Sequence, residues 1–392
     1  MVEVGLLVLA GFVSILAATL AIELISAVAL ERVPRHETGP KETPRIAVLI
    51  PAHNEGARLL ATIEDVKEQL FPRGRVLVVA DNCTDETAEV ARAAGAEVTE
   101  RQDAERRGKG YALHWGLEYL KANPPEIVII VDADCRVGPN TIGTLASVAF
   151  TSGRPVQALY NMRKAEGGTT SRSAVQEFAW ILVNHVRPIG LAKIGLPCQL
   201  MGTGMAFPWH AINSVPLATG DLVEDVKLGL DLAAEGYPPR FCPSVYVEST
   251  FPTSESGNID QRRRWEIGSL RLLLRNGPRY LWRASRTGNL HLFFLAMDAM
   301  VPPLTLLGGL LVVFWLAALG VAVAGYGSSP LFVLTAAGVL VAGSLVAAWA
   351  KFGRHVLELK DAWQLVPFLI QKFKIYKWRP GHVLQWTRTD RS

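Results

Sequence analysis

Three long apolar stretches constrain the fold of this chain more than any other feature. They cover Gly5–Leu30, about 303–324 and 331–350, and each is long enough to cross a bilayer as a helix. Apolar residues make up 49% of the chain and charged residues only 19%, which is typical of a protein with membrane segments. Glu23 is unusual inside the first stretch, where it could snorkel, pair with another helix or mark a boundary.

The charges that flank these stretches predict their orientation. Arg32, Arg35 and Lys41 follow the first stretch and no basic residue precedes it, so a cleavable signal peptide of the usual form is not expected. Basic residues also outnumber acidic ones after Ala350. Because basic flanks tend to stay in the cytoplasm, the sequence predicts an integral protein of the cell (inner) membrane with its N-terminus outside. The middle of the chain and the C-terminus would then be cytoplasmic.

Between the first and second apolar stretches the pattern is that of an α/β domain. Apolar, β-branched runs predict strands, and longer mixed segments between them predict helices. The expected strands are Ile46–Pro51, Val76–Asp81, Ala96–Thr99 and Ile127–Asp132, and the expected helices cover about 57–70, 84–94 and 110–121. Alternating strands and helices imply a mainly parallel sheet with right-handed crossovers.

The last of these strands runs directly into two carboxylates, Asp132 and Asp134. Ligands of open α/β sheets bind at the carboxyl ends of the strands, and alternate residues of an extended segment point the same way. The pair could therefore face one site and hold a hard cation such as Mg²⁺ or Mn²⁺. The same residues could instead form an ordinary Asp-rich turn, and the rest of the chain decides between the two interpretations.

Four further polar motifs occur where a nucleotide site would need them, and each also has a plainer interpretation. Pro51–Glu55 could contact a base or ribose, or cap a helix through Asn54. Asp81 could do the same, or form an Asx turn. The segment Arg107–Gly110 places glycines and Lys109 at a helix start, which favours a diphosphate. Glu224 and Asp225 could supply a general base or merely cap a helix.

Composition argues against several other functions. The net charge of +4 is mild, and no nucleic-acid-binding signature is present, so nucleic acid is not an expected partner. The four cysteines are far apart and form no Cys-x-x-Cys, which favours reduced thiols over structural zinc or a disulfide framework. No Ser/His/Asp or Cys/His arrangement stands out.

Two segments look amphipathic. Residues 260–286 alternate arginines with Trp265, Trp282 and leucines, which is typical of a helix at a membrane surface, although an Arg-rich helix packed on the domain is the alternative. Trp363–Tyr376 is too short to span a bilayer and is expected to be interfacial or re-entrant.

The ordered motifs resemble those of the family 2 inverting glycosyltransferases. The resemblance covers about 45–275 and includes Gln261-Arg-Arg-Arg-Trp265, and it is greatest for the membrane branch containing cellulose, hyaluronan and chitin-oligosaccharide synthases. It implies a GT-A type nucleotide-diphosphosugar transferase domain, about three transmembrane helices and amphipathic interface helices. The implied partners are a nucleotide-sugar donor, a saccharide or lipid-linked acceptor, the lipid bilayer and, for an exported polymer, export proteins.

The resemblance also implies a role for each matching residue. Asp225 would be the catalytic base and Glu224 its support. Asp134 would ligate Mg²⁺ or Mn²⁺, with Asp132 nearer the ribose. The donor would contact Pro51, His53, Glu55, Asp81, Arg107, Lys109, Asp132, Gln261, Arg264 and Trp265, and the acceptor would contact Met201, Gly202, Thr203 and Trp265.

These features together predict five regions. They are an N-terminal transmembrane helix at 1–31, a cytoplasmic catalytic domain at 42–258, amphipathic interface helices at 259–300, a transmembrane hairpin at 301–350 and a basic cytoplasmic tail at 351–392. The expected reaction forms a β-glycosidic bond on a growing polysaccharide or lipid-linked saccharide, with a UDP-sugar as donor. The alternatives are transfer of one sugar to a membrane lipid, a nucleotidyltransferase, and a non-catalytic scaffold of a secretion complex.

Overall fold

The computed structural model describes residues 2–31, 44–163, 171–218, 223–251, 266–268 and 270–360. These residues form two compact units, each built from separated stretches of the chain. The described part of the α/β unit is 44–163, 196–218 and 223–251, and that of the helical unit is 2–31, 171–195, 266–268 and 270–360. Residues 171–195, which the sequence analysis assigned to the catalytic domain, therefore belong to the helical unit.

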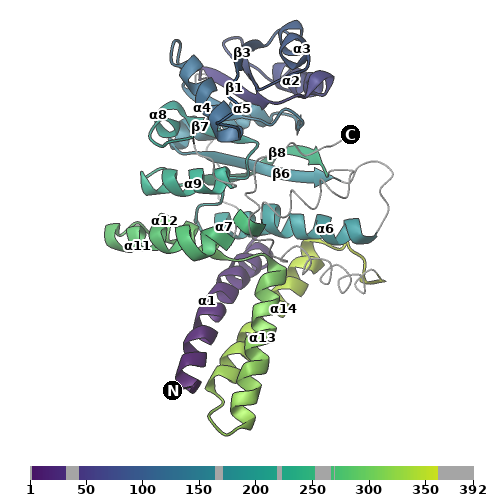
Figure 1. Ribbon diagram of the computed structural model, residues 1–392. Helices are drawn as coiled ribbons and strands as arrows, with labels where there is room; N and C mark the ends of the chain where they lie inside the picture. The colour runs from purple at the N-terminus through teal and green to yellow at the C-terminus, as the bar shows by residue number, and fades with distance from the viewer. Residues whose placement is uncertain are drawn as a thin grey trace. The chain divides into compact units, whose positions relative to one another are not determined.

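The α/β unit is built on an eight-stranded sheet in the order β3-β2-β1-β4-β7-β6-β8-β5 (Figure 1). Its strands are β1 (Ile46–Ala52), β2 (Arg75–Asp81), β3 (Glu97–Arg101), β4 (Ile127–Ile130), β5 (Arg136–Val137), β6 (Val156–Arg163), β7 (Met205–Pro208) and β8 (Arg240–Thr250). Strands β1 to β4 pair in parallel, as the sequence predicts. Strand β7 pairs antiparallel with β4 and β6, so the sheet is mixed beyond that point.

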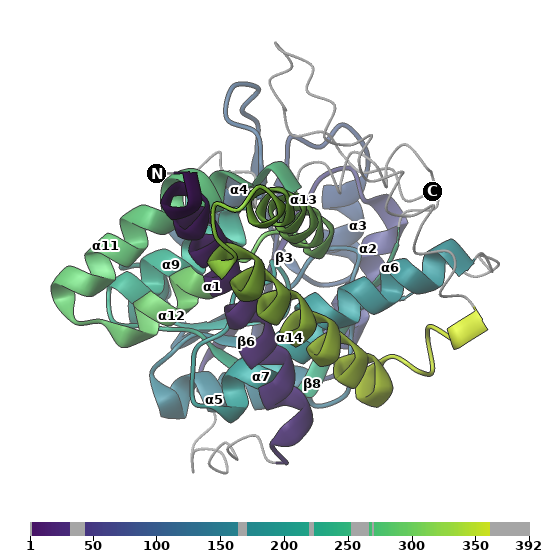
Figure 2. The same cartoon turned by 90° about the horizontal axis from the view of Figure 1, so that it is seen from below.

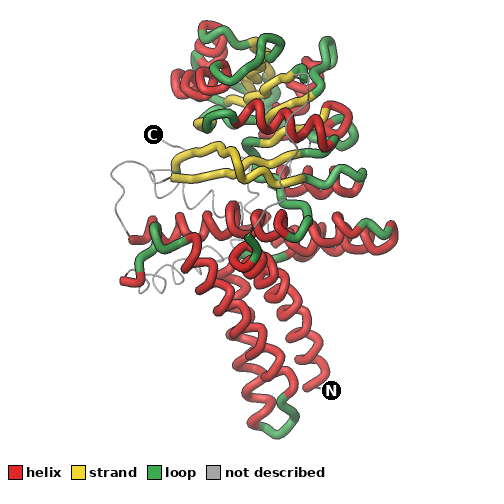
Figure 3. The backbone as a smooth tube through the Cα atoms, turned by 180° about the vertical axis from the view of Figure 1, so that it is seen from behind, coloured by secondary structure: helices red, strands yellow, loops and turns green. Residues whose placement is uncertain are grey.

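Helices cover both faces of this sheet (Figure 3). They are α2 (Leu59–Lys67, after the short 3₁₀ turn Gly56–Arg58), α3 (Thr87–Ala93), α4 (Lys109–Leu120), α5 (Thr141–Ser152), α8 (Trp209–Ile212) and α9 (Glu224–Ala234). Helices α4, α8 and α9 pack their apolar faces on β1, β2 and β4 to form one core. Gly116 lets α4 approach closely, because a Cβ there would lie only 2.4 Å from Leu49 Cδ1. Helix α4 is therefore held firmly against the strands.

The helical unit contains three helices that are long and apolar enough to cross a membrane. They are α1 (Val2–Ala29), α13 (Leu304–Val323) and α14 (Ser329–Phe352), in agreement with the expected spans. Helix α1 packs along α14, and α13 and α14 form a hairpin (Figure 2). Shorter helices complete the unit, namely α6 (Ser171–Ile181), α7 (Arg187–Lys193), α11 (Gly277–Thr287) and α12 (Leu290–Met300).

Two prolines explain the irregular turns in these shorter helices. A π-helical turn at Leu182–Val186 precedes Pro188, and a second at Leu272–Asn276 precedes Pro278. Proline lacks an N–H and its ring clashes with the carbonyl four residues earlier, so regular α-helical bonding cannot continue through it.

Arg187 joins two buried carboxylates, Glu23 and Asp298, inside the helical unit. Arg187 donates from Nε to Glu23 Oε2 at 2.5 Å and from its terminal nitrogen to Asp298 Oδ1 at 2.5 Å. The two carboxylates are only 1% and 5% exposed. Of the alternatives for Glu23, the structure therefore supports pairing with another helix.

Candidate active site

The carboxyl ends of β1, β2 and β4 lie at one edge of the sheet, and the predicted acidic pair is there. Strand β4 ends at Ile130, and its ladder continues only through the Val131 N–H to Leu49 O bond. The extended geometry predicted for Asp132 and Asp134 is therefore wrong. A turn closed by the Cys135 N–H to Asp132 O bond follows instead, and it brings the ligand atoms of both aspartates and Cys135 within 4.8 Å of one another.

Lys109 joins this turn to a second loop. It is the first residue of α4, which the chain enters through Gly108 at φ 134°, a conformation that favours glycine. Its ammonium group pairs with Asp132 and donates to Gly202 O at 2.7 Å. Burial disfavours the ammonium charge, but Asp132, Glu224 and Asp225 outweigh this effect and raise the pKa of Lys109. Lys109 therefore stays protonated among these acids.

Asp225 approaches the same loop from α9. A Cβ at Gly202 would lie 3.5 Å from Asp225 Oδ2 and 3.6 Å from Lys109 Nζ. Asp225 also accepts a hydrogen bond from the Val226 N–H at 2.8 Å. Burial raises the pKa of Asp225, and burial together with the Asp225 charge raises that of Glu224 to about 7. A carboxylate with a raised pKa, half-buried beside a cation, is suited to accept a proton.

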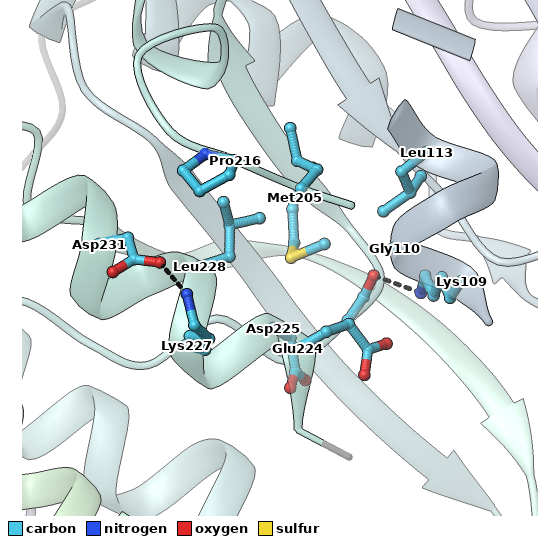
Figure 4. A pocket seen from close by; sticks show the side chains of 12 residues that line it. Lys109, Gly110, Leu113, Met205, Pro216, Glu224, Asp225, Lys227, Leu228 and Asp231 are labelled. Atoms are coloured by element: carbon cyan, nitrogen blue, oxygen red, sulfur yellow. Dashed lines mark hydrogen bonds and ion pairs between the residues drawn. The ribbon is translucent and has the colours of Figure 1, made fainter. Parts of the chain in front are cut away.

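A pocket opens between α4 and α9 (Figure 4). Lys109, Gly202, Glu224 and Asp225 form its polar side. Its other walls are mostly aliphatic, formed by Leu113, Met205, Pro216, Leu217 and Leu228. Lys227 and Asp231 complete the lining and pair with each other at 2.5 Å. The pocket thus places the acid pair beside apolar surface.

The loops after β1 and β2 are bonded to each other. His53 Nδ1 donates to Asp81 O at 2.7 Å, and Asn54 Oδ1 accepts from the Thr84 N–H at 2.7 Å. Asn54 and Asn82 adopt left-handed backbone conformations, which asparagine tolerates better than most residues. Pro51, His53 and Glu55 are half-buried along this edge, where a nucleotide contact remains a prediction.

Asp81 has a partner that the sequence analysis missed. Arg101 donates to its Oδ1 at 2.6 Å, and both side chains are largely buried. Asp81 and Arg101 are directly paired in the register of β2 and β3. The pairing of the two strands could therefore have predicted this ion pair, whereas the local sequence around either residue could not. Any donor contact by Asp81 must coexist with this ion pair. Arg107 is exposed in the loop before α4.

The predicted acceptor residues 201–203 differ in how far they are exposed. Met201 and Gly202 are half-buried, and Gly202 lines the pocket. Thr203 is fully buried, and its hydroxyl accepts from the Asp132 N–H at 3.0 Å. An acceptor contact through the Thr203 side chain is therefore wrong, because protein encloses it. Gln261, Arg264, Trp265 and the predicted surface helix Trp363–Tyr376 lie outside the described residues.

The acidic turn fits a hard divalent cation. Asp132 and Asp134 offer carboxylate oxygens, which Mg²⁺ and Mn²⁺ prefer. Cys135 is also within reach, but thiolate sulfur suits softer metals than Mg²⁺ and Mn²⁺. The two carboxylates are therefore the metal-ligand candidates among these three side chains.

A mainly parallel sheet with an acidic turn at its carboxyl edge and a second acid pair in a nearby pocket is the arrangement of a glycosyltransferase domain of the GT-A type. Residues 44–268 match the family model "Glycosyltransferase like family 2", which covers more than half of the chain, and the protein belongs to this family.

Curated relatives and a solved structure agree with this assignment. The chain is 27% identical over 271 residues to the probable glycosyltransferase YdaM of Bacillus subtilis, covering 62% of this chain and 59% of that protein. It is 23% identical over 262 residues to a poly-beta-1,6-N-acetyl-D-glucosamine synthase of Staphylococcus epidermidis, covering 64% and 60%. The matched region thus spans about three fifths of these relatives.

The solved mannosyltransferase PcManGT of Pyrobaculum calidifontis, determined with GDP-Man and Mn²⁺, has the same fold. It superposes with a TM-score of 0.51 at 20% identity, over 88% of this chain and 98% of that one.

Proposed function

We propose that this protein transfers a sugar from a nucleotide-diphosphate sugar, a UDP-sugar in the first instance, to a growing polysaccharide or lipid-linked saccharide at the membrane. The observation that supports this most directly is the position of Lys109, which pairs with Asp132 and donates to Gly202 O, while Asp225 lies beside the same glycine. It gives one site a cation for a diphosphate, an acidic turn for the donor and a base for an acceptor hydroxyl.

Each residue then has a distinct task. Asp225 accepts the proton of the acceptor hydroxyl as that oxygen attacks the anomeric carbon, and Glu224 adds negative charge beside it. Lys109 offers positive charge to the diphosphate as the sugar leaves. Asp134, with Asp132 as a second candidate, would hold Mg²⁺ or Mn²⁺. When bound, that ion would supply further positive charge for the leaving diphosphate.

One direct displacement inverts the anomeric carbon, so an α-linked donor gives a β-linked product. Asp225 serves as base rather than nucleophile, and the proton that it takes balances the charge of the departing nucleoside diphosphate. The three apolar helices support a membrane location, with the N-terminus outside and the α/β unit in the cytoplasm.

Transfer of a single sugar to a membrane lipid is a second candidate. The aliphatic residues Leu113, Leu217 and Leu228 line the pocket beside Asp225, and such walls would also suit the apolar part of a lipid alcohol. The polymer and the glycolipid require the same base and donor site, so product analysis must separate them.

A donor panel tests both candidates. Membranes containing the protein are incubated with radiolabelled UDP- and GDP-sugars and Mg²⁺ or Mn²⁺, and products are sorted by size and by lipid extraction. A high-mass product supports the polymer, and a labelled lipid supports the second candidate. Absence of transfer from every donor, or transfer that Asp225→Asn leaves unchanged, would overturn the proposal.

A further inference from the structure

The acidic turn is held from two sides by buried threonine hydroxyls. From α2, Thr62 Oγ1 donates to Ala133 O at 2.8 Å and to Cys135 O at 2.7 Å. From the loop before β7, Thr203 Oγ1 accepts from the Asp132 N–H at 3.0 Å and donates to Cys135 Sγ at 3.6 Å. Thr62 is 1% exposed and Thr203 is fully buried. Water therefore cannot easily replace either hydroxyl.

Thr203 is itself fixed from the far side of its loop. The Gln157 side chain on β6 donates to Thr203 O at 2.9 Å and to Ala158 O at 2.8 Å, and it accepts from the Met201 N–H at 2.8 Å. Gln157 has no exposed surface. This glutamine holds residues 201–203 as a rigid loop, and the Gly202 carbonyl of that loop receives Lys109.

We propose that Thr62 and Thr203 are positioning residues of the transfer site with different tasks. Among the described residues, the Thr62 hydroxyl bonds only to the acidic turn, so it fixes the carboxylates that face the donor. Thr203 bonds the turn and also adjoins Gly202, which lies against Lys109 and Asp225. It therefore sets the spacing between the donor side and the base. This assignment rests on the function proposed above, because it assumes that the turn binds a cation and a donor.

Positioning residues matter because a catalytic site tolerates only small displacements of its reacting groups. A misplacement of about 1 Å at a catalytic centre can cost roughly a hundredfold in rate. Replacing either threonine by valine keeps the volume but removes a bond and leaves buried backbone groups unpaired, which is costly. The turn is then expected to shift or to sample several positions, while the fold remains.

Thr141 provides a matched control. It is also fully buried in the α/β unit, and its hydroxyl likewise donates to a backbone carbonyl, Tyr246 O, at 3.1 Å. It has no bond to the acidic turn or to residues 201–203 among the described contacts. Thr141→Val therefore reports the general cost of losing such a bond.

The experiment measures Mn²⁺ binding to the full chain in detergent by electron paramagnetic resonance, without donor, and then donor KM and kcat in the transfer assay. Thr62→Val should weaken Mn²⁺ binding and raise donor KM by about tenfold, leaving kcat within about twofold. Thr203→Val should do the same and also lower kcat by about tenfold. Thr62→Ser and Thr203→Ser should keep Mn²⁺ binding, donor KM and kcat near their wild-type values. Thr141→Val should leave the same three quantities unchanged.

Two results would overturn the assignment alone. One is normal Mn²⁺ affinity and KM in both valine variants while the wild type binds Mn²⁺. The other is a change of Mn²⁺ affinity and donor KM in Thr141→Val that equals the change in the Thr62 and Thr203 valine variants. Absence of Mn²⁺ binding in the wild-type protein would overturn the metal site of the proposed function, and this inference with it.

Discussion

Asp225 lies half-buried at the start of α9, with Lys109 nearby and an aliphatic pocket beside it. Asp225→Asn keeps the shape of the side chain but removes the base. We expect transfer to fall by about 10²–10⁴-fold while nucleotide binding is retained, because general base catalysis contributes this much. Initial transfer rates and nucleotide titration by calorimetry would measure the two quantities.

Asp231→Asn is the matched control for this variant. Asp231 lines the same pocket from the same helix and pairs with Lys227. Its transfer rate should remain within about threefold of the wild type, because the proposed function gives Asp231 no task as base, donor contact or metal ligand. An equal loss in both variants would argue against a special role for Asp225.

Glu224 predicts a particular pH dependence. Its pKa is raised to about 7 by burial and by the Asp225 charge. Glu224 therefore ionises as the pH rises through about 7, and its new charge makes the neighbouring Asp225 a stronger base. The wild-type rate should rise through this range, in addition to the loss at lower pH where Asp225 itself is protonated.

Glu224→Gln should abolish the rise near neutrality and keep the loss at lower pH. The glutamine cannot ionise, so only the Asp225 step remains. Measurement of kcat/KM against pH for both proteins would show the difference. An unchanged inflection in the variant would assign that ionisation to another group.

Among single residues, the sequence predicted the charged side chains of the site better than the buried residues that hold them in place. Lys109, Asp132 and Asp225 follow strands or open helices, and the structure brings them together. Arg101 and Thr62 escaped prediction because nothing local distinguishes them from ordinary surface or core residues. Their partners are 20 and 71 residues away, so only the tertiary fold reveals them.

At the scale of elements, the strands β1 to β4 were predictable and the later strands were not. Strands β1, β2 and β4 are apolar, β-branched runs whose burial is fixed on both faces. Strand β7 (Met205–Pro208) contains no β-branched residue, and its position between β4 and β6 depends on long-range pairing. The loop before it, which holds Thr203, was for the same reason the least predictable part of the site.

Helix α4 should be sensitive to a single added methyl group. A Cβ at Gly116 would lie 2.4 Å from Leu49 Cδ1 and 2.9 Å from Val79 Cγ2. We expect Gly116→Ala to destabilise the protein by about 1–3 kcal/mol through overpacking, although alanine favours helix formation. Thermal unfolding of the purified protein in detergent would report the change.

Gly229→Ala in α9 is the control for this substitution. Its Cβ would lie 3.5 Å from Leu200 Cγ, which is ordinary contact. Here the helix preference of alanine should prevail and stabilise the protein by up to about 1 kcal/mol. If both variants unfolded at the same temperature, close packing of α4 would not be the cause.

At the scale of the whole molecule, the buried cluster of Arg187, Glu23 and Asp298 ties together three helices that are distant in sequence. Arg187→Met should destabilise the protein by about 3–5 kcal/mol, because two buried carboxylates lose their cation. The triple variant that also carries Glu23→Gln and Asp298→Asn should recover much of this loss. Unfolding in detergent would measure both.

An exposed ion pair provides the comparison. Arg92 pairs with Glu100, and the two side chains are 49% and 50% exposed. Arg92→Ala should change stability by no more than about 1 kcal/mol. A cost as large as that of Arg187→Met would mean that burial does not distinguish the two pairs.

The buried cluster also has a consequence for biosynthesis. Glu23 leaves the ribosome 164 residues before Arg187, and Asp298 follows Arg187 by a further 111. At ordinary translation rates, Arg187 is synthesised roughly 8–33 seconds after Glu23. During that interval the helix has an acid without its native partner, which disfavours insertion of the helix into the membrane. The yield of inserted protein should therefore depend on translation speed between these residues and on the insertion factors that hold the helix meanwhile.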